Sequence, residues 1–183
     1  MSSNTGPVDI REQIAENRGA IKKLELLVPG LRTYRKLDDI RVADNILRNQ
    51  VADKLLAART NLDTLRKQMA DAGYYSSLTT VGSLMANLQQ LAGQVRHGEE
   101  GYAGIAASFS IDDEKLNKLY EYDYDFVQAA FDVADSTSSD KVRFDSSNPA
   151  SVNTVLDEIQ KRIQSFRDKW SVRIEYMEGV LLK

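Results

Sequence analysis

Apolar residues recur every three or four positions along residues 152–181. The spacing repeats over eleven residues, and such a repeat, at about 3.67 residues per turn, keeps the apolar stripe on one side of a nearly straight helix. Because a lone helix cannot bury such a stripe, it needs companion helices in this chain or in a partner. The stripe consists of Val152, Val155, Ile159, Ile163, Phe166, Trp170, Ile174, Met177 and Leu181.

A second long stripe predicts a helix over residues 37–72, on the order of 50 Å in length. Its spacing changes partway, from steps of four to alternating steps of three and four, which resembles a stutter in a coiled-coil seam. Small residues within the stripe would let a neighbouring helix approach closely. The stripe consists of Ile40, Ala43, Leu47, Val51, Leu55, Ala58, Leu62, Leu65, Met69 and Ala72.

Three shorter patterns predict helices over residues 8–28, 76–97 and 111–135, and the C-terminal stripe predicts one over residues 149–182. No segment alternates apolar and polar residues in the manner of strands joined by a hairpin turn. The sequence therefore predicts an all-α fold. We expect an elongated helical bundle of about five helices, two of them long and coiled-coil-like, in a single domain spanning residues 1–183.

Proline, glycine and small polar residues mark the expected helix ends. Pro29-Gly30 ends the first helix, because proline disfavours a helical residue before it. Gly73 is a typical C-cap for the second helix. Ser110, three residues before an aspartate, predicts the N-cap of the fourth helix. Asn148, followed by a proline, predicts the start of the fifth.

The composition is typical of a soluble globular domain. The chain has 183 residues, of which 42% are hydrophobic and 28% charged. It contains no cysteine, which excludes disulfides, thiolate metal sites and cysteine nucleophiles. No apolar run has the length of a transmembrane helix, and the first residues lack the basic-then-apolar pattern of a signal peptide. We therefore expect a cytoplasmic protein with no transmembrane segment.

Charge is distributed unevenly along the chain. Residues 1–72 hold 13 Lys and Arg against 10 Asp and Glu, and residues 73–183 hold 11 against 17. The total of −3 gives no general attraction to nucleic acid. The asymmetry has two interpretations, pairing of helices within the fold or steering of a partner. Internal pairing is the commoner explanation.

Two stretches carry a resemblance to other proteins. The first is Leu27-Val28-Pro29-Gly30-Leu31-Arg32-Thr33-Tyr34-Arg35-Lys36, followed by Arg41, Asp44, Leu47 and Arg48. The second is Gly101-Tyr102-Ala103-Gly104, followed by Leu119-Tyr120-Glu121-Tyr122-Asp123. Together they resemble a family of short helical proteins of bacteria and archaea. That family has a PGYxxYxx(K/R) opening, then R-x-x-D-x-x-L-R, and a later GYAG…LYEYD segment.

The resemblance covers roughly residues 20–130 and leaves the C-terminal stripe unmatched. Leu31 stands where the family has an aromatic residue after Pro-Gly, and Ala106-Ala107-Ser108-Phe109 departs from the family's Leu-Phe-Asp-Ala. The resemblance implies a helical protein and no particular reaction. Some members of the family occur near membrane-scaffold proteins of the band-7 type, which implies a role in assemblies.

A cluster of basic residues after the first helix is the best surface candidate. It would suit an acidic protein, a phosphate or an anionic membrane surface. Alternatively, these residues pair with the acidic fourth helix and with Asp38, Asp39 and Asp44, which we favour. Nucleic acid and ribosome binding are disfavoured, since no aromatic-rich basic stripe is present. Together with the C-terminal stripe, the candidate partner-binding residues are Arg32, Tyr34, Arg35, Lys36, Arg41, Arg48, Ile163, Phe166 and Trp170.

The segment 120–126 alternates aromatic and acidic residues and offers a ligand site as an alternative. Glu121 and Asp125 lie one helical turn apart and could hold a hard cation or take part in acid–base chemistry. A dinuclear metal bundle needs Glu-x-x-His pairs, whereas His97 is the only histidine and has no glutamate three residues before it. We therefore expect no metal and no cofactor. The candidate ligand-binding residues are Tyr120, Glu121, Asp123 and Asp125.

Three functions follow from these patterns. The favoured one is a non-enzymatic helical-bundle protein that binds other chains or associates with itself through its long helices. The first alternative is a ligand- or metal-binding bundle, or an enzyme, with a pocket between the second and fourth helices that tyrosines line and arginines close. The second alternative is a peripheral protein that associates with a membrane scaffold through residues 32–36.

Overall fold

The computed structural model describes residues 10–31, 37–98, 112–142 and 148–181. Over these residues the chain forms five α-helices and no strand, which confirms the predicted all-α bundle with two long helices. Each helix lies within two residues of its predicted bounds. The elements are α1 (Ile10–Leu27), α2 (Leu37–Asp71), the 3-10 turn η1 (Tyr75–Ser77), α3 (Leu78–Arg96), α4 (Asp113–Thr137) and α5 (Pro149–Leu181).

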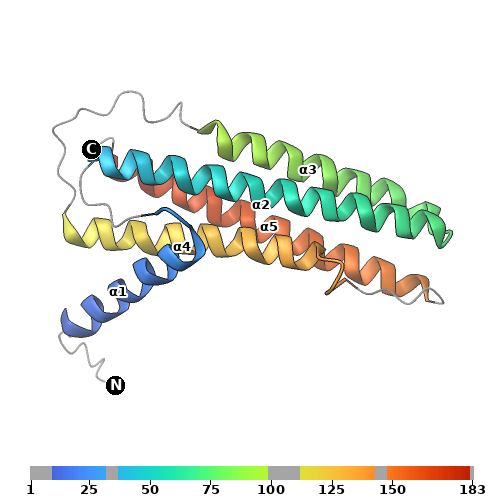
Figure 1. The fold of residues 1–183 in the computed structure, drawn as a ribbon, viewed down its shortest axis with the longest axis horizontal. Helices are drawn as coiled ribbons and strands as arrows, with labels where there is room; N and C mark the ends of the chain where they lie inside the picture. The colour runs from blue at the N-terminus through green and yellow to red at the C-terminus, as the bar shows by residue number, and fades with distance from the viewer. Residues whose placement is uncertain (1–9, 32–36, 99–111, 143–147, 182–183) are drawn as a thin grey trace, which may run out of the picture.

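Helices α2, α3, α4 and α5 lie side by side along the long axis of the molecule (Figure 1). Their directions alternate, so that α2 and α4 run one way and α3 and α5 the other. The most extensive packing joins α2 to α3 and α4 to α5. α2 also packs along α4, whereas α3 and α5 meet only sparsely. These four helices form the bundle.

Helix α1 lies outside the bundle and packs mainly on α4. It leaves the side of α4 at an angle, and its N-terminal end points away from the other helices (Figure 1). Its described part buries Leu24 completely, and Val28 follows at 1% exposure. The opposite edge stays in solvent, since Leu26 is 83% exposed. α1 is thus attached along one edge only.

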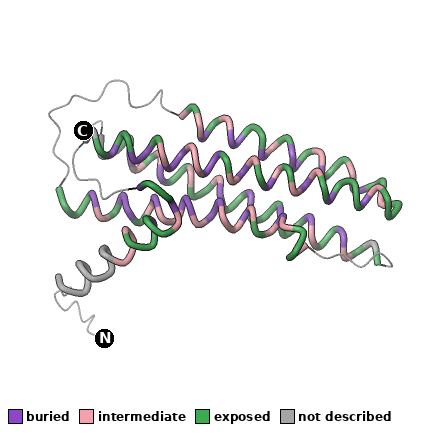
Figure 2. Tube along the Cα trace, in the orientation of Figure 1, coloured by how far each residue is buried: buried purple, intermediate pink, exposed green. Residues whose placement is uncertain are grey.

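The interior is built from the two long stripes, together with apolar residues of α3 and α4 (Figure 2). On α2, every stripe position from Ile40 to Met69 is buried, and Ala72, which follows the end of the helix, is exposed. On α5, Ile163 and Phe166 are 3% and 0% exposed and Trp170 is half-buried. The expectation that these residues offer a seam to a partner is corrected, because α4 and the rest of the bundle already cover them.

The helix ends follow local chemistry. Gly73 has φ +84°, and the N–H of Tyr74 donates to the carbonyl of Met69 at 2.8 Å, which confirms the predicted C-cap. The prediction for α4 was wrong by two residues. Its N-cap is Asp112, whose Oδ1 accepts from the backbone N–H of Lys115 at 2.8 Å, and position 110 lies outside the described residues. No helix in the described part of the chain carries an apolar stretch that could cross a bilayer.

Candidate functional site

Four charged side chains lie in the interior, near the end of the bundle where α2 and α4 begin and α3 and α5 end. They are Asp44 and Arg48 on α2, Asp123 on α4 and Arg173 on α5. None is more than 4% exposed. We call these four residues the buried ion-pair network. A buried charge is costly unless it is paired and hydrogen-bonded. The contacts among these four side chains therefore decide whether this end of the bundle is stable.

Arg173 connects three helices. Its Nε donates to Asp123 Oδ1 at 2.7 Å, and its Nη2 donates to Asp44 Oδ1 at 2.7 Å. Charge-assisted hydrogen bonds of this length are among the stronger polar contacts in proteins. One guanidinium therefore joins α5 to α4 and to α2.

Arg48 adds α3 to the network. Its Nε donates to Asp44 Oδ2 at 2.7 Å, so Asp44 accepts from two arginines. Its Nη1 donates to the backbone carbonyl of Arg96 at 2.8 Å, and the carbonyl of Val95 lies at 3.4 Å. The last carbonyls of a helix have no partner within the helix. Arg48 thus satisfies the end of α3 while its charge is balanced by Asp44.

Aromatic rings surround the guanidinium of Arg173. Its Cζ lies 5.1 Å from the ring centre of Phe126 and 5.8 Å from that of Trp170, which are cation–π distances. Phe126 and Trp170 stack with their centres 4.8 Å apart. Gly98 closes this layer, because a Cβ at that position would lie 3.3 Å from Trp170 Cζ2. Glycine is therefore favoured at position 98, because it lets the end of α3 approach the indole of Trp170 closely.

The network is suited to structure rather than to a reaction. Both aspartates accept hydrogen bonds from guanidinium groups. A general base needs access to the proton that it abstracts, and none of the four residues lines either of the two cavities described below. The two arginines balance the charge of the two aspartates, and their contacts fix the relative positions of α2, α3, α4 and α5.

The remaining predicted residues are dispersed. Arg41 is exposed on α2 and Tyr120 is buried on α4. Glu121 accepts from Lys118 at 2.8 Å and Asp125 from Lys169 at 2.7 Å, so each forms its own surface ion pair. Within the described residues, no group of three or more metal-ligating side chains comes together. Residues 32–36, and with them the candidates Arg32, Tyr34, Arg35 and Lys36, lie outside the described part of the chain.

A pair of tyrosines joins the start of α4 to the end of α5. The rings of Tyr122 and Tyr176 lie 4.8 Å apart, and the Tyr176 hydroxyl donates to the carbonyl of Lys115 at 2.9 Å. Burial raises the pKa of Tyr176, and the neighbouring Tyr122 adds to the effect. The hydrogen bond with Glu121 raises the pKa of Lys118. Both shifts favour the protonation states that these groups already have at neutral pH.

Sequence reasoning missed Arg173 and treated Asp44 and Arg48 as surface residues. The signal was present in the spacing, since Trp170, Arg173 and Met177 follow the same steps of three and four as the apolar stripe. A charged residue at a stripe position predicts a buried charge that requires a partner of opposite sign. The pairing of Arg48 with Asp44 was one of the open alternatives and is confirmed.

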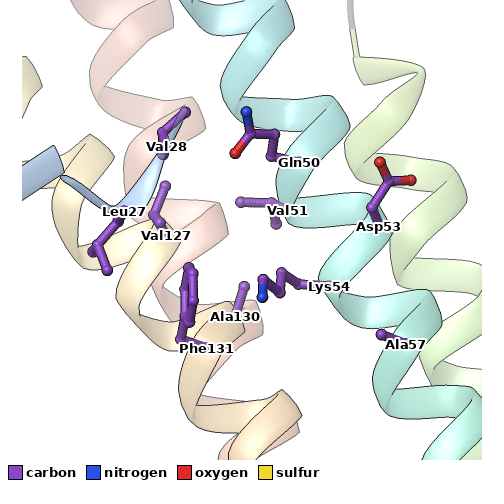
Figure 3. A pocket seen from close by; sticks show the side chains of 10 residues that line it. All are labelled: Leu27, Val28, Gln50, Val51, Asp53, Lys54, Ala57, Val127, Ala130 and Phe131. Atoms are coloured by element: carbon purple, nitrogen blue, oxygen red, sulfur yellow. The ribbon is translucent and has the colours of Figure 1, made fainter. Parts of the chain in front are cut away.

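A groove of about 300 Å³ lies where the end of α1 meets α2 and α4 (Figure 3). It lies between the second and fourth helices, where the alternative function expected a pocket, but among the described residues neither tyrosine nor arginine lines it. We call it the α1–α2–α4 groove. The lining residues are Leu27, Val28, Gln50, Val51, Asp53, Lys54, Ala57, Val127, Ala130 and Phe131.

A second cavity of about 480 Å³ lies at the opposite end, where α4 connects to α5. Four of its charged lining residues form ion pairs with one another, Lys141 with Asp135 and Arg162 with Glu158, and the fifth, Asp132, accepts a hydrogen bond from Gln128 at 3.0 Å. The α1–α2–α4 groove is therefore the better candidate for binding. Comparisons with protein-family models, with curated protein sequences and with solved structures find no match to this chain.

Proposed function

We propose that this chain is a non-enzymatic helical-bundle protein that works by binding other polypeptide chains, copies of itself included, and that α1 is its binding element. The observation that carries the proposal is the one-sided attachment of α1. Leu24 is fully buried against the bundle, whereas Leu26, two residues later, is 83% exposed. A helix held along one edge leaves the rest of its surface for another chain.

The burial of the α5 stripe also favours this assignment. Each of α2, α4 and α5 packs against at least two other helices of the chain. Among the described residues of these helices, the exposed large apolar side chains are isolated ones, Val42 on α2 and Val172 on α5. Binding through α1 therefore replaces the earlier expectation of a seam along the long helices.

The exposed surface of α1 suggests the chemistry of the partner. Lys22 and Leu26 are four residues apart, so they lie on the same face of the helix, and both are exposed. Lys23 is exposed as well. A matching surface would combine an apolar pocket for the leucine with acidic groups at its rim. A second helical chain with acidic residues beside an apolar stripe has these properties.

Site-specific photo-cross-linking tests the proposal. A photoreactive amino acid is placed at position 26 in the full-length chain, and a control chain carries it at position 75. Tyr75 is 71% exposed at the far end of the bundle, so it matches Leu26 in exposure and apolar character. Cross-linked products from the native cells are then identified by mass spectrometry, together with products formed by the purified chain alone.

We expect a product of defined mass at position 26 and none at position 75. A product with the purified chain identifies self-association, and a product in cells alone identifies another protein. The proposal fails if the two positions give the same products or if neither gives any. The non-enzymatic part rests on the carboxylates of the buried ion-pair network, which are already held by arginines.

A further inference from the structure

Among the described residues, the α1–α2–α4 groove combines apolar walls with one charged side chain, Lys54, that forms no ion pair. Val51 on α2 and Val127 on α4 are 1% and 2% exposed and form the walls, and Phe131 is half-buried at one end. A volume of about 300 Å³ lies at the lower end of the range for small-molecule pockets. The size and lining suit a small, mostly apolar molecule.

Lys54 supplies the positive charge. Its side chain extends from α2 across the groove toward α4, and Nζ lies 4.3 Å from the ring centre of Phe131 (Figure 3). Lys54 is half-buried, and it forms no ion pair within the described part of the chain. A partly desolvated ammonium over an aromatic ring attracts an anion more strongly than an exposed lysine does, because water screens it less.

The other polar groups of the groove already have partners. Asp53 points to the opposite side of α2, where it pairs with Arg96 of α3. The Gln50 side-chain amide donates to the carbonyl of Pro29 at 3.0 Å and so ties α2 to the turn after α1. Among the described residues, Lys54 is therefore the charge that a ligand in this groove would meet.

We infer that the α1–α2–α4 groove binds a small anionic amphiphile, a medium-chain aliphatic carboxylate of the fatty-acid type. Its carboxylate pairs with Lys54 Nζ, and its alkyl chain lies along Val51, Val127 and Phe131. The positive charge of Lys54 favours an anionic head group, and the apolar walls of the groove favour an alkyl chain. This ligand-binding activity is separate from the binding of polypeptides through the outer face of α1.

Titration with decanoate, below the concentration at which it forms micelles, tests the inference on the full-length protein. Calorimetry measures the affinity, and the methyl NMR signals of Val51 and Val127 locate the site. Decanol and decyltrimethylammonium carry the same alkyl chain with no charge and with a positive charge. We expect one decanoate per chain, shifts at both valines, weaker binding of decanol and no binding of the cation.

Three variants separate the charge from the cavity. Lys54→Met keeps the length of the side chain and removes its charge, and we expect about a tenfold loss of decanoate affinity, the size expected for a partly screened ion pair. Lys67→Met is the matched control, since Lys67 lies on the same helix, is exposed and pairs with Asp63; it leaves the affinity unchanged. Ala57→Phe fills the groove from an exposed position and abolishes binding.

Each variant is used only if its circular dichroism and Tm match those of the parent chain. Lys54→Arg, which keeps the charge, provides a second check and retains binding. The inference is overturned if the parent chain does not bind decanoate, if decanol or the cation binds equally well, or if Lys54→Met and Lys67→Met behave alike.

Discussion

The four-helix bundle and helix α1 satisfy their packing in different ways. Within the bundle, the long stripes of α2 and α5 are covered, and the interior charges form one closed network. At α1, one edge is buried and the other lies in solvent. The adjoining groove contains Lys54, which lies over the Phe131 ring and forms no ion pair with the described residues. The difference indicates that the bundle provides stability, whereas the junction of α1 with α2 and α4 retains the capacity to bind.

The largest expected effect comes from breaking the network. Arg173→Leu removes the guanidinium that holds Asp44 and Asp123 and leaves two buried carboxylates with less compensation. We expect the free energy of unfolding to fall by about 3–5 kcal/mol in urea denaturation. Arg162→Leu is the control on the same helix, since its ion pair with Glu158 is exposed, and it costs less than about 1 kcal/mol. Similar losses in the two variants would show that the network is not the stabilising feature.

Two equivalent leucine truncations compare the bundle with α1 directly. Leu62 on α2 and Leu24 on α1 are both 0% exposed. Leu62→Ala creates a cavity in the bundle and should cost about 2–5 kcal/mol. Leu24→Ala should lower the global free energy of unfolding by less than about 1 kcal/mol, because α1 can detach before the bundle unfolds. Urea midpoints measure both changes, and equal losses would mean that α1 unfolds together with the bundle.

A double-mutant cycle measures the coupling inside the network. Asp123→Leu and Arg173→Leu each leave a buried charge with fewer partners, whereas the double variant removes both charges. We therefore expect the double variant to be more stable than the sum of the single losses predicts, by about 1–3 kcal/mol. Additive losses would indicate that the 2.7 Å contact between the two side chains contributes no specific stability.

The smallest expected effect concerns the start of α4, the helix that both regions share. The backbone N–H of Lys115 donates to Asp112 and lowers the pKa of this carboxyl below its ordinary value of 3.8. Since the folded-state pKa is lowered, the stabilisation is present above the ordinary pKa and is lost as the pH falls through the folded-state value. Asp112→Ala should therefore lower Tm by a few degrees at pH 7. The difference from the parent chain should shrink below pH 4, and a constant difference would contradict this cause.

The apolar half of the architecture could be predicted from sequence because burial there follows spacing alone. The stripe from Ile40 to Met69 and the stripe beginning at Val152 predicted two long helices, and both helices form. The first stripe is buried throughout, whereas the second is buried at five positions and half-buried at Val155, Trp170 and Ile174. Glycine and proline also located Gly73 and the start of α5. These signals are local, since they depend on helical periodicity and on backbone conformation.

Of the charged half, the pairing of Arg48 with Asp44 within α2 was anticipated. The contacts of Arg173 could not be predicted because its partners lie on different helices. Arg173 is 50 positions from Asp123 and 129 from Asp44 in the chain. Nothing local distinguishes Asp44 and Arg48 from solvated charges, whereas Arg173 follows the spacing of the apolar stripe on its helix. The two stretches that carried the family resemblance do contribute Asp44, Arg48 and Asp123, but their meeting with Arg173 is a property of the tertiary packing.

Native-state hydrogen exchange tests the division between the bundle and α1 most directly. The amides of Ile21, Leu24 and Leu27 would be compared with those of Leu55 and Leu62 under identical conditions. We expect the α1 amides to exchange through local opening, with a free energy at least about 2 kcal/mol below that of the α2 amides, which should open only with global unfolding. Equal protection in the two helices would contradict the separation of a stable bundle from a one-sided, binding helix.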